Sequence, residues 1–71
     1  MTRYLVLIEP TETGFSAYSP DLPGCISTGR TPEEVEANMR EAVSGHLEEL
    51  REAGLPIPAP STSASYVEVA A

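Results

Sequence analysis

Cys25 and His46 are the two side chains of this sequence best suited to catalysis, and each is the single member of its residue type. A thiolate and an imidazole can serve as nucleophile and base when they meet. His46, however, falls in a run of apolar residues at helical spacing, which favours a core or interface imidazole. Thiol activation needs positive charge nearby, and the chain has four arginines and no lysine. We therefore expect Cys25 to act as a small buried hydrophobic residue.

Carboxylates are the other groups that could do chemistry, by holding a metal ion. Four lie close together in the sequence: Glu33, Glu34, Glu36 and Glu41. Nothing around them resembles a calcium loop, so they favour a solvated helix face. Glu9 and Asp21 lie on or beside predicted strands, but two carboxylates are too few for a two-metal nuclease site. The sequence predicts no catalytic, metal or cofactor site, and a degenerate nuclease is the least favoured class.

Length and charge narrow the remaining classes. The 71 residues form one domain, 1–71, with eleven acidic residues and a net charge of −7. Such a surface repels nucleic acid and anionic lipid and favours a basic partner, although acidity can also serve solubility alone. The apolar run Leu5–Ile8 is too short for a signal or a membrane span. With one cysteine and no export signal, we expect a cytoplasmic protein stabilised by oligomerisation.

The segment from Pro20 to Cys25 predicts a rigid loop between two strands. Pro20 and Pro23 each fix φ near −65° and lack an N–H, so neither suits a central strand. Gly24 offers a free φ just before the next strand. Asp21, between the prolines, is expected to cap the turn through its side chain.

The helix has start and stop signals at both ends. Gly29 ends the preceding strand, and Thr31 and Glu34 have the spacing of an N-cap and its capping-box partner. Apolar residues then recur at helical spacing as far as Leu50, and Gly54 is suited to the position just after the helix. Gly45 lies inside this pattern, which suggests a close packing contact.

The strand patterns complete a β-β-β-α-β order. Strands are predicted at 4–9, 15–19, 25–28 and 66–69, with the helix beginning after Thr31. A right-handed crossover would place the last strand beside the first, giving a two-layer α+β sandwich with a mixed four-stranded sheet. One helix covers only one sheet face, which leaves an apolar patch on the other. We therefore expect a partner or oligomer interface at Leu5, Leu7, Tyr18, Asp21 and Leu22.

These residues resemble the HicB family, the antitoxin halves of bacterial HicA–HicB toxin–antitoxin pairs. The resemblance rests on Tyr4–Glu9, on Gly14-Phe15 with Ala17, and above all on Pro20-Asp21-Leu22-Pro23-Gly24-Cys25. It continues through Gly29, Thr31 and Glu33-Glu34 to the Ala42 region and Gly54-Leu55-Pro56-Ile57-Pro58, so that it spans about residues 3 to 60.

The resemblance implies a partial RNase H-like fold without a nuclease site. It also implies a partner, a small basic ribonuclease toxin of the HicA type, which the protein would bind and neutralise. Many family members carry a C-terminal DNA-binding domain, which we do not expect in this chain, so we do not expect it to repress its own operon by itself. The net charge of −7 independently predicts no direct binding to nucleic acid. The alternative is an orphan homo-oligomeric structural or regulatory module that binds a small ligand or another protein.

Overall fold

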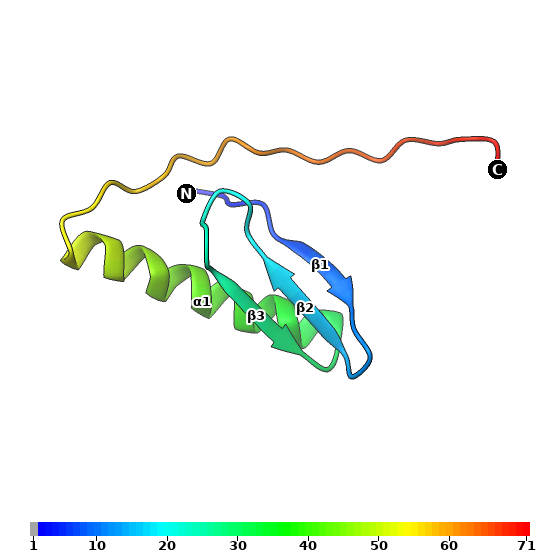
Figure 1. The fold of residues 1–71 in the computed structure, drawn as a ribbon, viewed down its shortest axis with the longest axis horizontal. Helices are drawn as coiled ribbons and strands as arrows, with labels where there is room; N and C mark the ends of the chain where they lie inside the picture. Colours follow the sequence, from blue (N-terminus) through cyan, green and yellow to red (C-terminus); the bar gives the residue numbers. More distant parts are fainter. Residues whose placement is uncertain (1) are drawn as a thin grey trace.

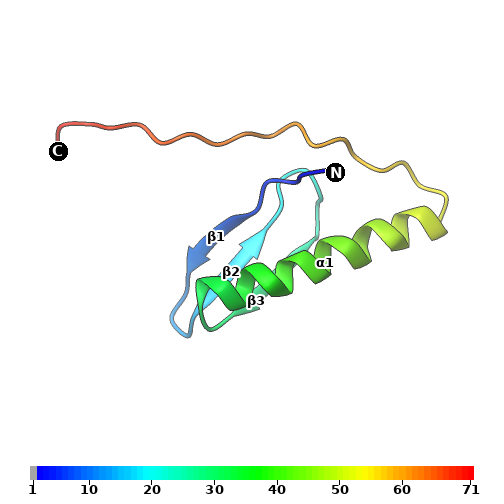
Figure 2. The same cartoon turned by 180° about the vertical axis from the view of Figure 1, so that it is seen from behind.

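The computed structural model describes residues 2–71 as three antiparallel strands packed on one helix. β1 spans Leu7–Pro10, β2 Phe15–Tyr18, β3 Ile26–Gly29 and α1 Pro32–Glu52. The sheet lies in front of α1 in Figure 1 and behind it in Figure 2, so the helix covers one face only. The predicted α+β class and the order of these four elements are confirmed.

The strands are joined in the order β1-β2-β3 by short links. A backbone bond of 2.8 Å from Thr11 N–H to the Gly14 carbonyl closes the first hairpin. In the register, Ala17 lies opposite Ile8 on one side and Ser27 on the other. Ala17 is buried beneath the helix, and because side chains alternate along a strand, its neighbours point away from the helix.

The fourth strand predicted at 66–69 is absent from the part of the chain that the structure describes. No strand is assigned after α1, and the chain from Leu55 onward is irregular. In both Figure 1 and Figure 2 this segment crosses beside the N-terminal residues and continues past the sheet. A strand is defined by its pairing with another strand, and residues 66–69 do not pair with the free edge of β1.

α1 begins and ends where its local signals indicate. Thr31 is the N-cap, its hydroxyl accepting a 3.0 Å bond from Glu34 N–H, and a proline occupies the first turn. At the other end Leu55 N–H donates to the Leu50 carbonyl and Gly54 N–H donates to that of Arg51. With Gly54 at φ +70°, these two bonds form the Schellman motif that closes a helix.

The core is small and lies between the sheet, α1 and the loop before β3. Its buried hydrophobic members are Ala17, Leu22, Cys25, Val35 and Met39. A Cβ on Gly29 would come within 2.6 Å of Val35 N, so the helix can approach β3 because this residue has no side chain. Gly45, by contrast, has open space around it. The close packing contact predicted at Gly45 is therefore wrong.

Candidate partner-binding surfaces

The loop between β2 and β3 is built from two consecutive turns. Leu22 N–H donates to the Ser19 carbonyl at 3.1 Å, and Cys25 N–H donates to the Leu22 carbonyl at 3.0 Å. Each turn therefore has a proline at its second position, where a fixed φ suits turn geometry. In the second turn Gly24 follows with φ +83°, the conformation of a type II turn, which disfavours any side chain at that position. The turns that the prolines and glycine predicted are present, and the rigidity of the loop stays a prediction.

Leu22 is the last residue of the first turn and the first residue of the second, and it is fully buried in the core. Its side chain is therefore not available to a partner, and its assignment to an interface is wrong. An apolar residue between turn-forming prolines looks exposed in a sequence, but here the double turn points it inward. Leu22 anchors the loop to the domain, and the exposed atoms of the loop belong to its neighbours.

Cys25 and His46 lie on the same shallow hollow but show no sign of an activated pair. The hollow has a volume of about 270 Å³ and lies between the loop and α1. Cys25 is buried, and its burial raises the pKa of the thiol above its usual value. A thiol with a raised pKa is protonated at neutral pH and a poor nucleophile. Within residues 2–71 no three His, Cys, Asp or Glu side chains are grouped so that they could hold a metal ion.

Asp21 connects the loop to the C-terminal segment through four hydrogen bonds. The backbone N–H groups of Ser61 and Thr62 each donate to Oδ2 at 3.0 Å, and their hydroxyls donate to Oδ1 at 3.1 and 2.7 Å. These bonds, led by the Thr62 amide, lower the pKa of Asp21 to about 2. Asp21 does more than cap its own turn, because it fixes the position of a segment forty residues away. We call this contact the Asp21 clasp.

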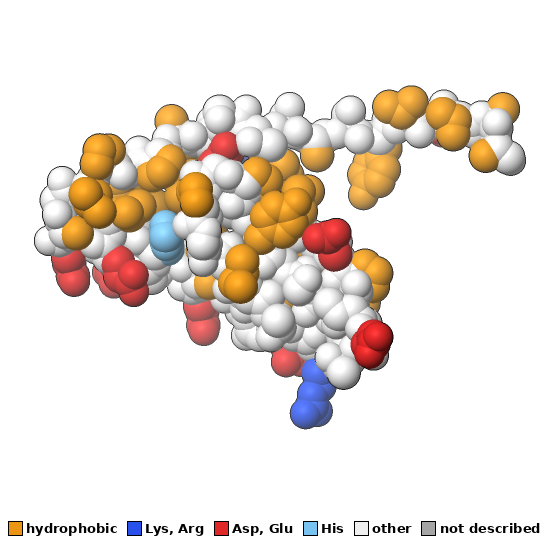
Figure 3. Space-filling model, viewed as in Figure 1, with side chains coloured by type: hydrophobic (Ala, Val, Ile, Leu, Met, Phe, Trp, Pro, Cys, Tyr) orange, Lys and Arg blue, Asp and Glu red, His pale blue; other side chains and the backbone are white. Residues whose placement is uncertain are grey.

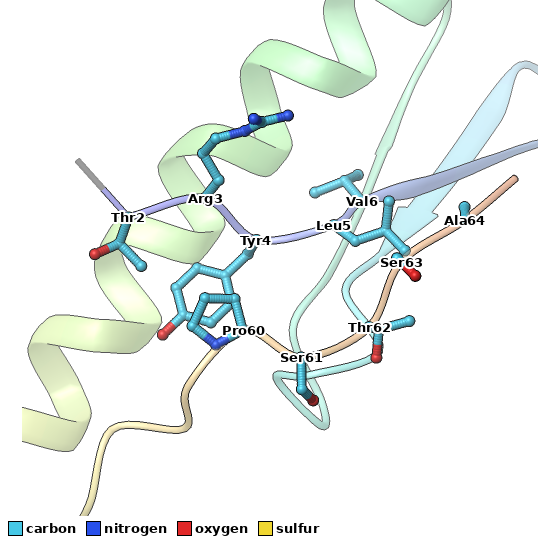
Figure 4. Close-up of a pocket in the computed structure, with 10 residues that line it drawn as sticks. All are labelled: Thr2, Arg3, Tyr4, Leu5, Val6, Pro60, Ser61, Thr62, Ser63 and Ala64. Atoms are coloured by element: carbon cyan, nitrogen blue, oxygen red, sulfur yellow. The ribbon is translucent and has the colours of Figure 1, made fainter.

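A second contact fixes the same segment one step earlier. The Tyr4 hydroxyl donates to the Pro58 carbonyl at 2.5 Å. Between the two contacts, residues 2–6 and 60–64 run alongside each other without strand pairing and border an open cleft of about 780 Å³ (Figure 4). Leu5, one of the predicted interface residues, lies in this cleft.

The face of the sheet opposite the helix carries an exposed apolar row. Leu7 lies opposite Tyr18, and Tyr18 lies opposite Ile26, so the three side chains cross all three strands on one face. Tyr18 is 39% exposed and Ile26 is 70% exposed. Of the predicted interface residues, the structure thus brings together Leu7 and Tyr18. We call Leu7, Tyr18 and Ile26 the outer row.

Charged and apolar side chains are partly segregated on the face of the molecule shown in Figure 3. Figure 3 shows hydrophobic side chains over the upper part of the sheet and near the C-terminal end of α1, with acidic side chains along the lower edge of the helix. Glu36 makes the one ion pair found among the described residues, at 3.6 Å from Arg40. Among those residues, no helix combines the length and apolar character needed to cross a membrane.

Sequence reasoning missed Ile26 and the residues bound by Asp21. The alternation of Cys25 and Ile26 indicates opposite faces, but only the strand register shows that Ile26 continues a row begun by Leu7. The Asp21 clasp joins residues forty and forty-one positions apart. The only sequence signal for such a contact is that one residue has a hydroxyl and the other a carboxylate. Many other residue pairs in the chain share this feature, so the signal does not identify the contact.

The fold and these surfaces define a class of small acidic α+β domains, with one helix on one antiparallel sheet and a double-turn loop. The chain belongs to the HicB-like antitoxins of bacterial toxin–antitoxin systems, whose family pattern matches residues 4–70. The predicted family is therefore confirmed.

Two solved structures are similar over most of the chain. A chain of a HicA3 and HicB3 toxin–antitoxin complex matches with a TM-score of 0.73 and 37% identity, covering 84% of this chain and 70% of that one. The antitoxin HicB3 alone matches with a TM-score of 0.70 and 37% identity, over 84% of this chain and 44% of that one.

Related sequences come from a phage, an archaeon and a bacterium. An uncharacterised 14.9 kDa protein of Haemophilus phage HP1 is 34% identical over 90% of this chain and 48% of its own length. A UPF0150 protein of Thermoplasma acidophilum is 35% identical over 79% of this chain and 83% of its own length. A UPF0150 protein of Helicobacter pylori is 41% identical over 62% of this chain and 61% of its own length. The chain thus spans about half the length of the phage relative.

Proposed function

We propose that this chain binds and neutralises a small basic ribonuclease toxin of the HicA type, in the cytoplasm and without catalysis of its own. The observation that carries the proposal is the similarity, at 37% identity and a TM-score of 0.73, to a chain of a HicA3–HicB3 complex. Because the fold and more than a third of the aligned residues are shared with that chain, we infer that the kind of partner, a HicA-type toxin, is shared as well.

The charge of the chain supports the same partner. A net charge of −7 on 71 residues produces a negative field that attracts a basic protein and accelerates encounter. A ribonuclease must itself attract RNA, so its binding face is basic. An acidic domain that meets this face competes directly with the substrate of the toxin.

The experiment is co-expression of the chain with the product of the neighbouring gene. We expect the chain to rescue growth, to co-purify with the toxin and to suppress RNA cleavage by the purified toxin. If the neighbour is a toxic ribonuclease and both rescue and co-purification fail, the proposal is overturned. The chain alone should cleave no RNA, and metal-dependent cleavage that disappears in Glu9→Gln or Asp21→Asn would contradict the absence of catalysis.

A second proposal, compatible with the first, is that the chain forms a homo-oligomer through the outer row. The observation that favours it is the exposure of Tyr18 and Ile26, with only five buried hydrophobic residues among residues 2–71. Contiguous exposed apolar side chains often mark a protein interface. Leu7 would lie within such an interface, and Leu5 would border it.

Sedimentation equilibrium of Ile26→Asp tests the homo-oligomer. If the outer row is an interface, Ile26→Asp should lose the association made through this row and sediment as a smaller species than the unsubstituted chain, whose monomer is 7.6 kDa. A monomeric unsubstituted chain at micromolar concentration would refute self-association. The mixed four-stranded sheet and the partial RNase H-like relationship also stay proposals, and they require a partner strand for residues 66–69.

A further inference from the structure

The C-terminal residues 63–71 leave the domain as an extended segment that pairs with no strand. Tyr66 is fully exposed, and Val67 and Val69 are 78% and 75% exposed. Because side chains alternate in extended chain, Val67 and Val69 share one face, and Tyr66 lies on the other with Glu68. Such a segment has the apolar alternation of a half-buried strand, but its exposed side chains contribute nothing to the fold of its own chain.

An edge strand that could accept such a segment is present in the sheet. β1 is an edge strand, and its outer backbone groups have no neighbouring strand among the described residues. Between this edge and α1 lies a cleft of about 520 Å³. Its lining has an apolar part, from Val6, Ile8, Met39 and Val43, and a charged part, from Arg3, Glu36 and Arg40. Ile8 is 39% exposed at this edge. An open edge beside an apolar cleft is a site for an added strand.

The apolar side chains on the two faces of residues 66–69 correspond to apolar surfaces on the two faces of the sheet at β1. A strand placed beside β1 with Val67 and Val69 towards α1 would put both valines over the apolar cleft. The same placement puts Tyr66 on the opposite face, next to Leu7, where it would extend the outer row by one strand. A shift of the pairing by one residue would exchange the two faces of the segment. The valines would then point away from the cleft, and Tyr66 would point away from the outer row.

The Asp21 clasp fixes the start of the C-terminal segment. Ser61 and Thr62 are fixed at Asp21 by four hydrogen bonds. From there the chain continues straight past the sheet, whereas β1 turns away from it, as Figures 1 and 2 both show. The segment is therefore extended and directed outward while the clasp is closed, and it can reach a second molecule with no change in its own domain.

We propose that residues 64–69 of one copy add to β1 of a second copy as a fourth strand, and that the second copy reciprocates. Each copy both donates a segment and accepts one, so the exchange closes as a two-fold dimer with no open edge at β1. The dimer uses the backbone of an edge strand for affinity and the two valines for specificity. This inference concerns self-association, and it stands or falls independently of the toxin.

The first experiment measures the dimer in the full chain and in a double variant, Val67→Asp with Val69→Asp. We expect a dimer by sedimentation equilibrium whose Kd rises roughly a hundredfold in the double variant, since two buried valines are replaced by charges. Ile26→Asp is the matched control: it places a charge on the outer row at the far edge strand, and it should leave the exchanged dimer intact. A monomeric parent chain, or a double variant that still dimerises when Ile26→Asp is also present to remove association through the outer row, overturns the proposal.

A cross-linking experiment distinguishes exchange from pairing within one chain. In a Cys25→Ser background, one population carries Ile8→Cys and the other Val67→Cys, and the two are mixed before a short bis-maleimide is added. Ile8 and Val67 would face the same cleft, so exchange predicts covalent heterodimers. If only a single chain carrying both cysteines becomes cross-linked, internally, the segment pairs with its own β1 and the exchange is refuted.

Discussion

Asp21 accepts hydrogen bonds from both the backbone amide and the hydroxyl of Thr62, at 3.0 and 2.7 Å. One residue lies in the loop before β3 and the other lies ten residues beyond the end of α1. The contact therefore ties together the two parts of the chain that have the least secondary structure. Because it depends on a carboxylate, it also makes the position of the C-terminal segment sensitive to acid.

The first prediction is that the Asp21 carboxyl titrates near pH 2. Hydrogen bonds from Thr62 and Ser61 favour the ionised form and lower the pKa from 3.8 to about 2. A pKa that is lower in the folded state gives a stabilisation that is fully present above pH 3.8 and is lost as the pH falls towards 2. An NMR titration of the side-chain carboxyl carbon measures this directly. A midpoint near 3.8 would show that the clasp is open in solution.

The second prediction concerns the segment that the clasp fixes. Asp21→Asn removes the charge that accepts these bonds, so the Ser61 and Thr62 amides should exchange with solvent faster at neutral pH. Glu48→Gln is a control with the same chemical change on the exposed face of α1, and it should leave these amides unaffected. Equal exchange rates in the parent and in Asp21→Asn would contradict the role of the carboxylate.

Local signals predicted the helix and the loop, whereas contacts between distant residues escaped the sequence. Thr31 and Gly54 act within one turn of their own positions, so residue type and spacing were sufficient to place both helix ends. The burial of Leu22 depends on how a double turn meets the helix. Likewise, the exposure of Tyr66 depends on whether residues 66–69 pair with a strand that is distant in the sequence. Neither property is encoded in the neighbouring residues.

The third prediction tests the second turn of the loop. Gly24 has φ +83°, although a Cβ there would meet no atom within 4 Å. Gly24→Val should therefore destabilise the fold through backbone strain alone, by roughly 1–3 kcal/mol. Chemical denaturation of the two chains measures the difference. An unchanged midpoint would mean that the loop adopts another conformation at no cost.

The fourth prediction compares two glycines with φ values that other residues also adopt. Gly45 lies inside α1 with open space around it, so Gly45→Ala should stabilise the fold by about 0.5–1 kcal/mol through helix propensity. Gly29→Ala should destabilise it instead, because the new Cβ would lie 2.6 Å from Val35 N. Thermal unfolding of both variants gives the two signs. Destabilisation by Gly45→Ala would indicate that another molecule packs against this part of α1.

The last prediction concerns how the proposed toxin complex forms. If the net charge of −7 steers a basic toxin, added salt should slow association more than it accelerates dissociation. Screening acts over about 10 Å at 0.1 M salt, so it weakens the long-range field and largely spares groups already in contact. Glu36→Gln with Glu41→Gln removes two charges from the exposed face of α1 and should lower the association rate in the same direction as salt. Stopped-flow mixing at several salt concentrations separates the two rate constants. An association rate independent of salt would show that shape rather than charge selects the partner, even if the complex itself is tight.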